Sequence, residues 1–316
     1  MFPFSFAEVF VYAFSLFWLF YLILFLWRMI FKPRRLLTAI RFISIACLTA
    51  SIVIFLFTFL WGLNYISPPL SQKLGLDIKK ASERDLADAT NISLRYANEY
   101  SGKVKRNTMG KCSFGSFSDL SSVASKAIIK QIPRSEYFNV SYCPGPKAVY
   151  FSPLMSYFGI TGIYFPFTGE SNVNTDNVTS DIPFVMTHEL SHRLGIARED
   201  EANFMAFLAC TDSSDPDFVY SGYLSAYIYT LNALYDASPD TAKKIIIQQS
   251  DYVTRDIKMI NEWVRKYEGP ASHAGEKINN TYLKSMGQKD GVRSYGRMVD
   301  LLIAYYNSSM FTDGKK

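Results

Sequence analysis

The sequence predicts a mostly helical α+β protein in which two N-terminal transmembrane helices precede a domain with a small β-sheet. Three observations support this fold class. Of the 25 Phe, 13 lie before residue 66. Two long uncharged runs occupy that same segment, and β-prone sequence is confined to a short central stretch before a long series of helical patterns. The average composition, 49% hydrophobic and 19% charged, therefore combines two unlike parts.

The first part, residues 1–65, is expected to form a transmembrane hairpin. Residues 9–27 and 42–63 are uncharged runs of 19 and 22 residues. A helix needs about 20 apolar residues to cross a hydrocarbon core of about 30 Å, so each run is long enough. The first run lacks the basic leader and the small-residue cleavage site of a secretory signal. The alternative, a pair of buried core helices, is disfavoured because such runs are rare outside membranes, so a lipid bilayer is an expected partner.

The loop between the runs, residues 28–41, sets the expected orientation. It contains five basic residues and no acid. The positive-inside rule places such a loop in the cytoplasm, so a multi-pass protein of the cell membrane is expected, with its N-terminus and its domain outside the cytoplasm. Five basic residues less one acid, Glu8, account for +4 of the net charge of +5. The remaining chain is nearly neutral, which argues against nucleic acid as a partner.

The second part begins with an expected extended linker at residues 66–80, where Ser67-Pro68-Pro69 disfavours a helix. The expected domain covers residues 81–316. Its predicted elements are a helix opened by a capping box at Ser82-Glu-Arg-Asp85 and reaching about Tyr100, a helix at 118–132, two β-prone stretches at 147–151 and 160–167, and helices almost throughout after Asp181.

The four cysteines leave one question open. Cys112 and Cys143 fall in turn-like stretches and could pair outside the cytoplasm, where disulfides persist. That pairing would leave Cys210 without a partner. No cysteine has a spacing typical of a metal site.

The segment His188-Glu189-Leu-Ser-His192 is an H-E-x-x-H motif. Residues four apart share one face of a helix, so both imidazoles can bind one Zn²⁺ ion. Glu189 can then act as the general base that takes a proton from the attacking water. The alternative is a chance motif on an ordinary helix. It is disfavoured because the flanks suit a helix and only three histidines exist in the chain.

A zinc enzyme needs a third protein ligand. The candidates are His273 in a distant loop and the acidic run Glu199-Asp200-Glu201. Glu199 and Glu201 differ by about 200° around a helix, so only one of them can face the metal. Glu201 precedes Met205 by four residues, which puts it on an apolar, inward face. We therefore expect Glu201 to be the ligand.

These residues also carry a resemblance. The H-E-x-x-H motif followed by Glu201-Ala202-Asn203 resembles the gluzincin metallopeptidases and, more distantly, the ImmA/IrrE-type peptidases. Residues 1–310 resemble an uncharacterised bacterial membrane family, the domain-of-unknown-function family numbered thirty-eight ten. The matching segments are Trp61-Gly-Leu-Asn-Tyr65 with Pro68-Pro69, residues 165–174, the zinc segment and residues 291–296. The resemblance implies a zincin-like outer domain on a membrane anchor.

Two departures from these families are visible. Members of the membrane family often carry one more span before Pro3, which leaves the true start of the chain open. Many gluzincins have an acid four residues after the ligand glutamate, whereas this chain has Met205. Another group, such as Glu199 or a backbone carbonyl, is then expected to support the histidines by hydrogen bonding.

The resemblance also implies a substrate site. Zincins bind the substrate backbone along an edge strand, and residues 160–174 are the natural candidate, with Glu170, Asn172 and Asn174 as substrate-binding residues. The alternative is a structural hairpin that turns at Thr168-Gly169. For the oxyanion of the transition state, Tyr295 is the favoured catalytic donor. The other candidates are Tyr223, Tyr227, Tyr229 and His273.

The expected function is a membrane-anchored, zinc-dependent metallopeptidase that cleaves a peptide or protein substrate. A zinc-binding sensor or adaptor without turnover is the main alternative, because motif and fold do not prove activity. A zinc hydrolase of a cell-wall amide is the second alternative.

Overall fold

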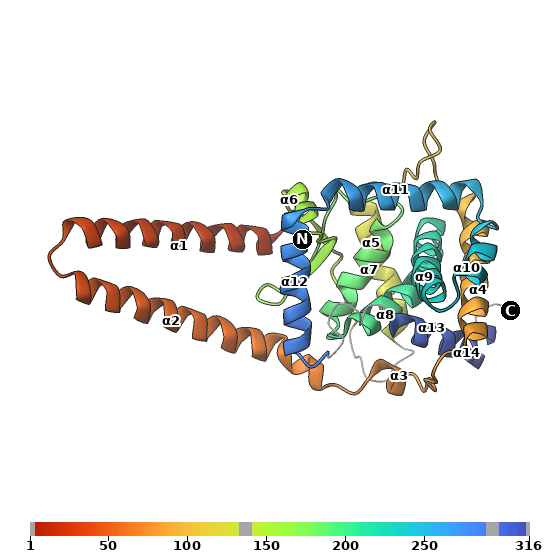
Figure 1. Cartoon of the computed structure of the whole chain (residues 1–316), viewed down its shortest axis with the longest axis horizontal. Coiled ribbons are helices and arrows are strands. Elements are labelled where there is room, and N and C mark those ends of the chain that lie inside the picture. Colours follow the sequence, from red (N-terminus) through yellow and green to blue (C-terminus); the bar gives the residue numbers. More distant parts are fainter. Residues whose placement is uncertain (1–3, 133–140, 289–296, 314–316) are drawn as a thin grey trace.

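The computed structural model describes residues 4–132, 141–288 and 297–313. It begins with two long helices, α1 (Phe6–Phe31) and α2 (Arg35–Leu60), which extend side by side away from a helical domain (Figure 1). Each has 26 residues and is long and apolar enough to cross a membrane. No residue in the most apolar stretch of either helix is buried by the rest of the chain. Two exposed apolar helices suggest membrane anchoring, because water disfavours such a surface.

The predicted spans fall largely within these helices. The helices are longer than the uncharged runs at their loop ends, where Arg28 and Arg35 lie inside α1 and α2. At the other end, α2 stops at Leu60, and a 3₁₀ helix, η1 (Gly62–Ile66), carries the chain into the domain.

The domain is mostly helical with one small sheet, as predicted. The capping box at Ser82 is confirmed, since Ser82 and Asp85 bond reciprocally at the start of α4. The domain helices are α3 (Leu70–Lys73), α4 (Glu83–Ser101), α5 (Phe117–Gln131), α6 (Ser152–Tyr157), α7 (Ile182–Arg193), α8 (Glu199–Thr211), α9 (Pro216–Ala237), α10 (Pro239–Ile246), α11 (Asp251–Tyr267), α12 (Pro270–Ser285), α13 (Met298–Tyr306) and α14 (Ser309–Asp313).

The hydrophobic core surrounds α8, which is buried on nearly every side. Phe204 and Phe207 of α8 are fully buried; α5, α7, α9 and α13 pack against α8, and α4 packs against α9. A helix that is buried on all sides belongs in a core. Helix α8 is therefore the central core helix against which α7 packs.

The sheet has the order β1-β3-β2, formed by β1 (Lys147–Ala148), β2 (Gly162–Phe165) and β3 (Glu170–Val173). Strands β2 and β3 are antiparallel and form a hairpin whose turn contains Gly169 at φ 65°. A positive φ suits glycine, which explains the turn at this position. Residues 162–173 thus form a hairpin, and β2 is an edge strand among the described strands.

All four cysteines are free thiols. The possible Cys112–Cys143 disulfide is not formed. The Cys112 thiol instead donates to Asp256 of α11 at 3.4 Å. Both thiols are buried, and burial raises the pKa of each of them.

Candidate metal centre

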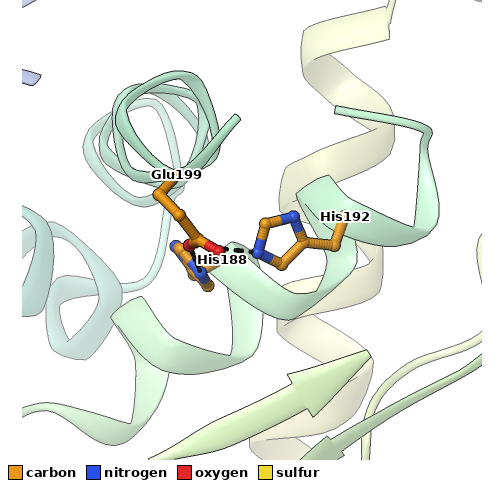
Figure 2. A group of neighbouring side chains, drawn as sticks. All are labelled: His188, His192 and Glu199. Atoms are coloured by element: carbon orange, nitrogen blue, oxygen red, sulfur yellow. Dashed lines mark ion pairs between the residues drawn. The ribbon is translucent and has the colours of Figure 1, made fainter. Parts of the chain in front are cut away.

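Helices α7 and α8 bring three potential ligands together (Figure 2). His188 and His192 lie one turn apart on α7, so both rings project from one face of the helix. Helix α7 ends before Gly195, whose φ of 86° is accessible to glycine and lets the chain reverse. Helix α8 then starts at Glu199, and its first side chain points back toward the two rings.

The spacing of these donor atoms suits a zinc ion. Glu199 Oε2 lies 3.3 Å from His188 Nε2 and 3.4 Å from His192 Nε2. With bonds of about 2.0–2.1 Å and tetrahedral angles, two zinc ligands are separated by about 3.3 Å. All three donor atoms lie within 4.8 Å of one another. The three residues therefore fit a three-ligand zinc site.

The second nitrogen of His192 is held by the backbone. Nδ1 donates to the carbonyl of Ile196 at 2.8 Å, so Nε2 is the atom left to face the ligand cluster. Zinc-bound histidines are commonly oriented in this way by a carbonyl or a carboxylate. A backbone carbonyl thus takes the supporting role that the acid at the position of Met205 has in many gluzincins.

The three side chains form a charged hydrogen-bonded cluster. Burial opposes a proton on His192, but the Glu199 carboxylate outweighs burial and raises the pKa of His192 to about 9. Burial alone would raise the pKa of Glu199, yet the two histidines hold that pKa well below its usual range. The negative charge of Glu199 therefore favours a positive charge between the three side chains.

Glu189 lies beside the cluster and under the edge strand β2. It is 4% exposed, and a Cβ atom on Gly162 would come within 2.5 Å of Glu189 Oε1. Only glycine lets the strand pass this close to the carboxylate. Burial raises the pKa of Glu189, and its Oε2 has no hydrogen-bond partner within the described part of the chain. A buried carboxylate with one unpaired oxygen is suited to take a proton.

The structure places Glu199, and not Glu201, with the histidines. Glu201 Oε1 accepts a hydrogen bond from the backbone of Leu70 at 2.9 Å and lies 3.3 Å from Arg198. Glu201 therefore ties the linker to the start of α8. The preference for Glu201 rested on its inward face, and because both acids are buried, that criterion does not distinguish Glu201 from Glu199.

The residues expected to bind substrate are occupied by other parts of the chain. Glu170 accepts from the backbone of Ala7 at 2.8 Å, and Asn172 accepts from Ser5 Oγ at 2.6 Å. Both side chains thus fasten the start of α1 to β3. Asn174 donates to Ser156 and to the Ile160 carbonyl. In this structure the three side chains bond to other parts of the chain, and none of them belongs to the cluster of His188, His192 and Glu199.

The candidate oxyanion donors are dispersed. Tyr295 lies outside the described residues. His273 is exposed on α12. Tyr223 stacks on Tyr96 in the core, and Tyr227 accepts from Gln249. Tyr229 lies nearer the site, since burial together with the carboxylates of Asp181 and Glu199 raises its pKa.

Sequence reasoning missed two aromatic residues at the site. Trp61, at the end of α2, packs edge-on against the His192 ring with 5.5 Å between centroids. Its Nε1 donates to the hydroxyl of Tyr282 on α12 at 2.6 Å. Burial raises the pKa of Tyr282, and Glu199 adds to that effect. Trp61 is the first residue of Trp61-Gly-Leu-Asn-Tyr65, one of the segments that carry the family resemblance. That resemblance was the signal in the sequence that could have pointed to Trp61.

Comparison with known proteins gives one result. The model of a family described as "Protein of unknown function (DUF3810)" matches residues 1–303. No curated protein and no solved structure matches the chain.

Proposed function

The chain belongs to the DUF3810 family, and from that premise and the geometry of the site we propose that it is a membrane-anchored zinc metallopeptidase. One observation carries the proposal: three zinc-type donor atoms converge beside a buried glutamate that lies under an edge strand. Zincin-type peptidases combine these features, with ligands and base on one helix and substrate along the neighbouring strand.

Each residue has a role in this proposal. His188, His192 and Glu199 hold the ion. When bound, zinc polarises the substrate carbonyl and lowers the pKa of a coordinated water. Glu189 takes the proton from the attacking water and passes it to the leaving amine. Strand β2 offers backbone groups to an extended substrate, and the hydroxyl of Tyr282, near Glu199, is a candidate donor to developing negative charge.

A proposal about membrane topology and an alternative function accompany this one. The basic loop between α1 and α2 favours a multi-pass topology with the loop in the cytoplasm, so the site would face outward. A zinc-binding sensor without turnover remains the alternative function that shares the same ligands.

Metal analysis of the purified full-length protein is the first test. One zinc ion per chain is expected, and His188→Ala should lose it. His273→Ala is the matched control, because His273 is an exposed histidine on α12 that does not belong to the cluster. A chain that purifies and stays folded without any divalent metal affinity would contradict the proposal.

Replacing the base separates the enzyme from the sensor. Glu189→Gln keeps all three ligands and removes the proton acceptor, so zinc content should be unchanged while cleavage of substrate proteins in membranes falls by about 10²-fold or more. Unchanged cleavage, or an unchanged cellular phenotype, would contradict peptidase activity. Hydrolysis of amide bonds in cell-wall fragments in place of protein substrates would identify the third possibility.

A further inference from the structure

The end of the second apolar helix forms part of the candidate site. Trp61 follows directly after α2 and is 7% exposed. Its indole contacts the His192 ring at 5.5 Å and the Tyr164 ring of β2 at 5.1 Å. Tyr282, which accepts from Trp61, also packs against Phe57 of α2. Trp61 and the last turn of α2 therefore together contact His192, the edge strand β2 and α12.

The start of the first apolar helix meets the same strand from its other end. Phe10 of α1 contacts Phe165 at 5.9 Å and Phe167 at 6.3 Å, at the tip of the β2–β3 hairpin. Edge strand β2 thus lies between the domain ends of α1 and α2. Helix α12 crosses the face of the domain that is turned toward the two helices (Figure 1).

These contacts set the height of the site relative to a bilayer. Phe55, Phe59 and Leu60 are exposed, so apolar surface continues to the last residue of α2. Lipid covering this surface reaches the level of Trp61, which is a typical residue of the membrane interface. The headgroup layer beyond the hydrocarbon is about 5–8 Å thick on each side. His192, whose ring centroid is 5.5 Å from that of Trp61, then lies at the level of the headgroups.

The domain has an apolar ledge on the same side. We define this ledge as Tyr150, Phe151, Leu154, Tyr157 and Phe158, all of them exposed. It adjoins α1, because Phe151 packs edge-on against Tyr12 and Glu8 accepts from the backbone of Tyr150 and Phe151. Exposed tyrosines and phenylalanines next to an apolar helix suit the membrane interface.

We propose that the substrate of this site is a membrane-tethered polypeptide, cleaved in an extended segment that lies at the bilayer surface directly next to its own transmembrane or lipid anchor. This inference rests on the proposed peptidase function and adds the substrate class. A segment leaving the bilayer beside the hairpin meets β2 and the metal cluster within the headgroup layer. A bond far above the membrane does not reach a site at that height.

A pair of tethered probes tests the height directly. Each probe has one poly-leucine transmembrane helix, a random segment of about 12 residues and a folded reporter. In the second probe a proline-rich spacer of about 30 residues, extended by about 3.1 Å per residue, lifts the random segment about 90 Å from the bilayer. Both are reconstituted with the full-length, zinc-loaded chain at equal surface density, and new N-termini are identified by mass spectrometry.

The near probe is expected to be cut at least about tenfold more than the lifted one, because only its segment shares the height of the site. The cuts should disappear in Glu189→Gln. Equal cutting of both probes, or stronger cutting of the lifted one, overturns the substrate class while leaving the peptidase intact. If neither probe is cut in a Glu189-dependent way, the peptidase function fails and the inference fails with it.

A second measurement does not depend on activity. In a full-length variant with Trp18, Trp27 and Trp263 replaced by Phe, Trp61 is the sole tryptophan. Its fluorescence in liposomes is expected to be quenched more by lipids brominated near the headgroup than by lipids brominated near the chain ends. Absence of quenching by every brominated lipid would put the site above the membrane and overturn the inference.

Discussion

Glu199 and Glu201 stand two residues apart at the start of one buried helix, yet their surroundings differ. Glu199 faces two imidazole nitrogens at 3.3 and 3.4 Å. Glu201 faces Arg198 and the backbone of Leu70. Because each carboxylate already has compensating partners, each can be buried at tolerable cost. Their partners therefore differ: Glu199 faces the two histidines, and Glu201 holds the linker.

The first prediction concerns this pair. Glu199→Gln removes an anionic ligand and is expected to weaken zinc binding by at least about 10²-fold, whereas Glu201→Gln should leave zinc affinity within a few fold. Competition with a zinc-selective chelator measures both. Glu201→Gln can lower thermal stability by weakening its pair with Arg198, so affinity is compared at a temperature where both variants are folded. The reverse order of affinities would assign the ligand to Glu201.

The second prediction concerns the proton on His192. A histidine whose pKa is raised to about 9 carries its proton throughout the neutral range, and a metal must displace that proton. Zinc binding at pH 7 should therefore release about one proton from His192, and the apparent affinity should rise about tenfold per pH unit below pH 9. Calorimetry in buffers of different ionisation enthalpy measures the release. Identical binding enthalpies in all buffers would contradict it.

At the scale of elements, the site depends on how closely β2 approaches α7. Gly162 leaves no room for a side chain, since its Cβ would lie 2.5 Å from Glu189 Oε1 and 2.7 Å from its Cγ. Strand β2 and Glu189 are thus in direct contact, which in the proposed peptidase would connect substrate position to proton transfer.

The third prediction follows from that contact. Gly162→Ala should displace either β2 or the Glu189 side chain and lower cleavage by about 10²-fold, while zinc content stays near one ion per chain. Gly169→Ala is the control, because a Cβ at that position meets no atom within 4 Å and only the positive φ of 65° disfavours alanine. The control should lose some stability and little activity. Full activity of Gly162→Ala would show that β2 and Glu189 need not be in contact.

Another element contact, remote from the site, holds α11. Asp256 is 1% exposed and accepts from Arg106, Tyr220 and Cys112. A buried pair that loses one partner leaves an uncompensated charge, which costs about 3–5 kcal/mol. The fourth prediction is that Arg106→Met lowers the unfolding temperature strongly. Lys258→Met, which removes an exposed ion pair on the same helix, should change it little. Equal effects would contradict the stabilising role of the buried pair.

At the scale of the whole molecule, the sequence predicted the features that depend on residues close to one another along the chain. The spacing of His188 and His192, the capping box at Ser82 and the two apolar helices all follow from neighbouring residues. The uses of Glu170 and Asn172 do not, because their partners Ala7 and Ser5 lie more than 160 residues away in sequence. A polar side chain beside a strand can serve a substrate or a distant helix end, and only the tertiary structure decides between them.

The contact of Trp61 with the site could not be predicted from the sequence for the same reason. A tryptophan after an apolar run predicts an interfacial anchor, and that prediction contains no information about His192. The contact arises because η1 and α3 run beside the start of α8, where Arg198 donates to the carbonyls of Tyr65 and Ser67. The linker therefore fixes the apolar hairpin to the candidate metal centre, so that the anchor and the site form one unit.

The fifth prediction tests how that unit lies on a membrane. With Cys47→Ser as background, the remaining cysteines are buried, so Leu154→Cys on the ledge can be labelled selectively with an environment-sensitive dye. In liposomes its emission is expected to shift to the blue and to be quenched by headgroup spin labels, because the ledge adjoins Tyr12 of α1. Ile247→Cys, at the end of α10, is the exposed control and should show neither effect, because α10 lies on the side of the domain away from the hairpin (Figure 1). If both positions behave alike, the domain does not rest on its ledge, and α1 and α2 alone hold the protein at the bilayer.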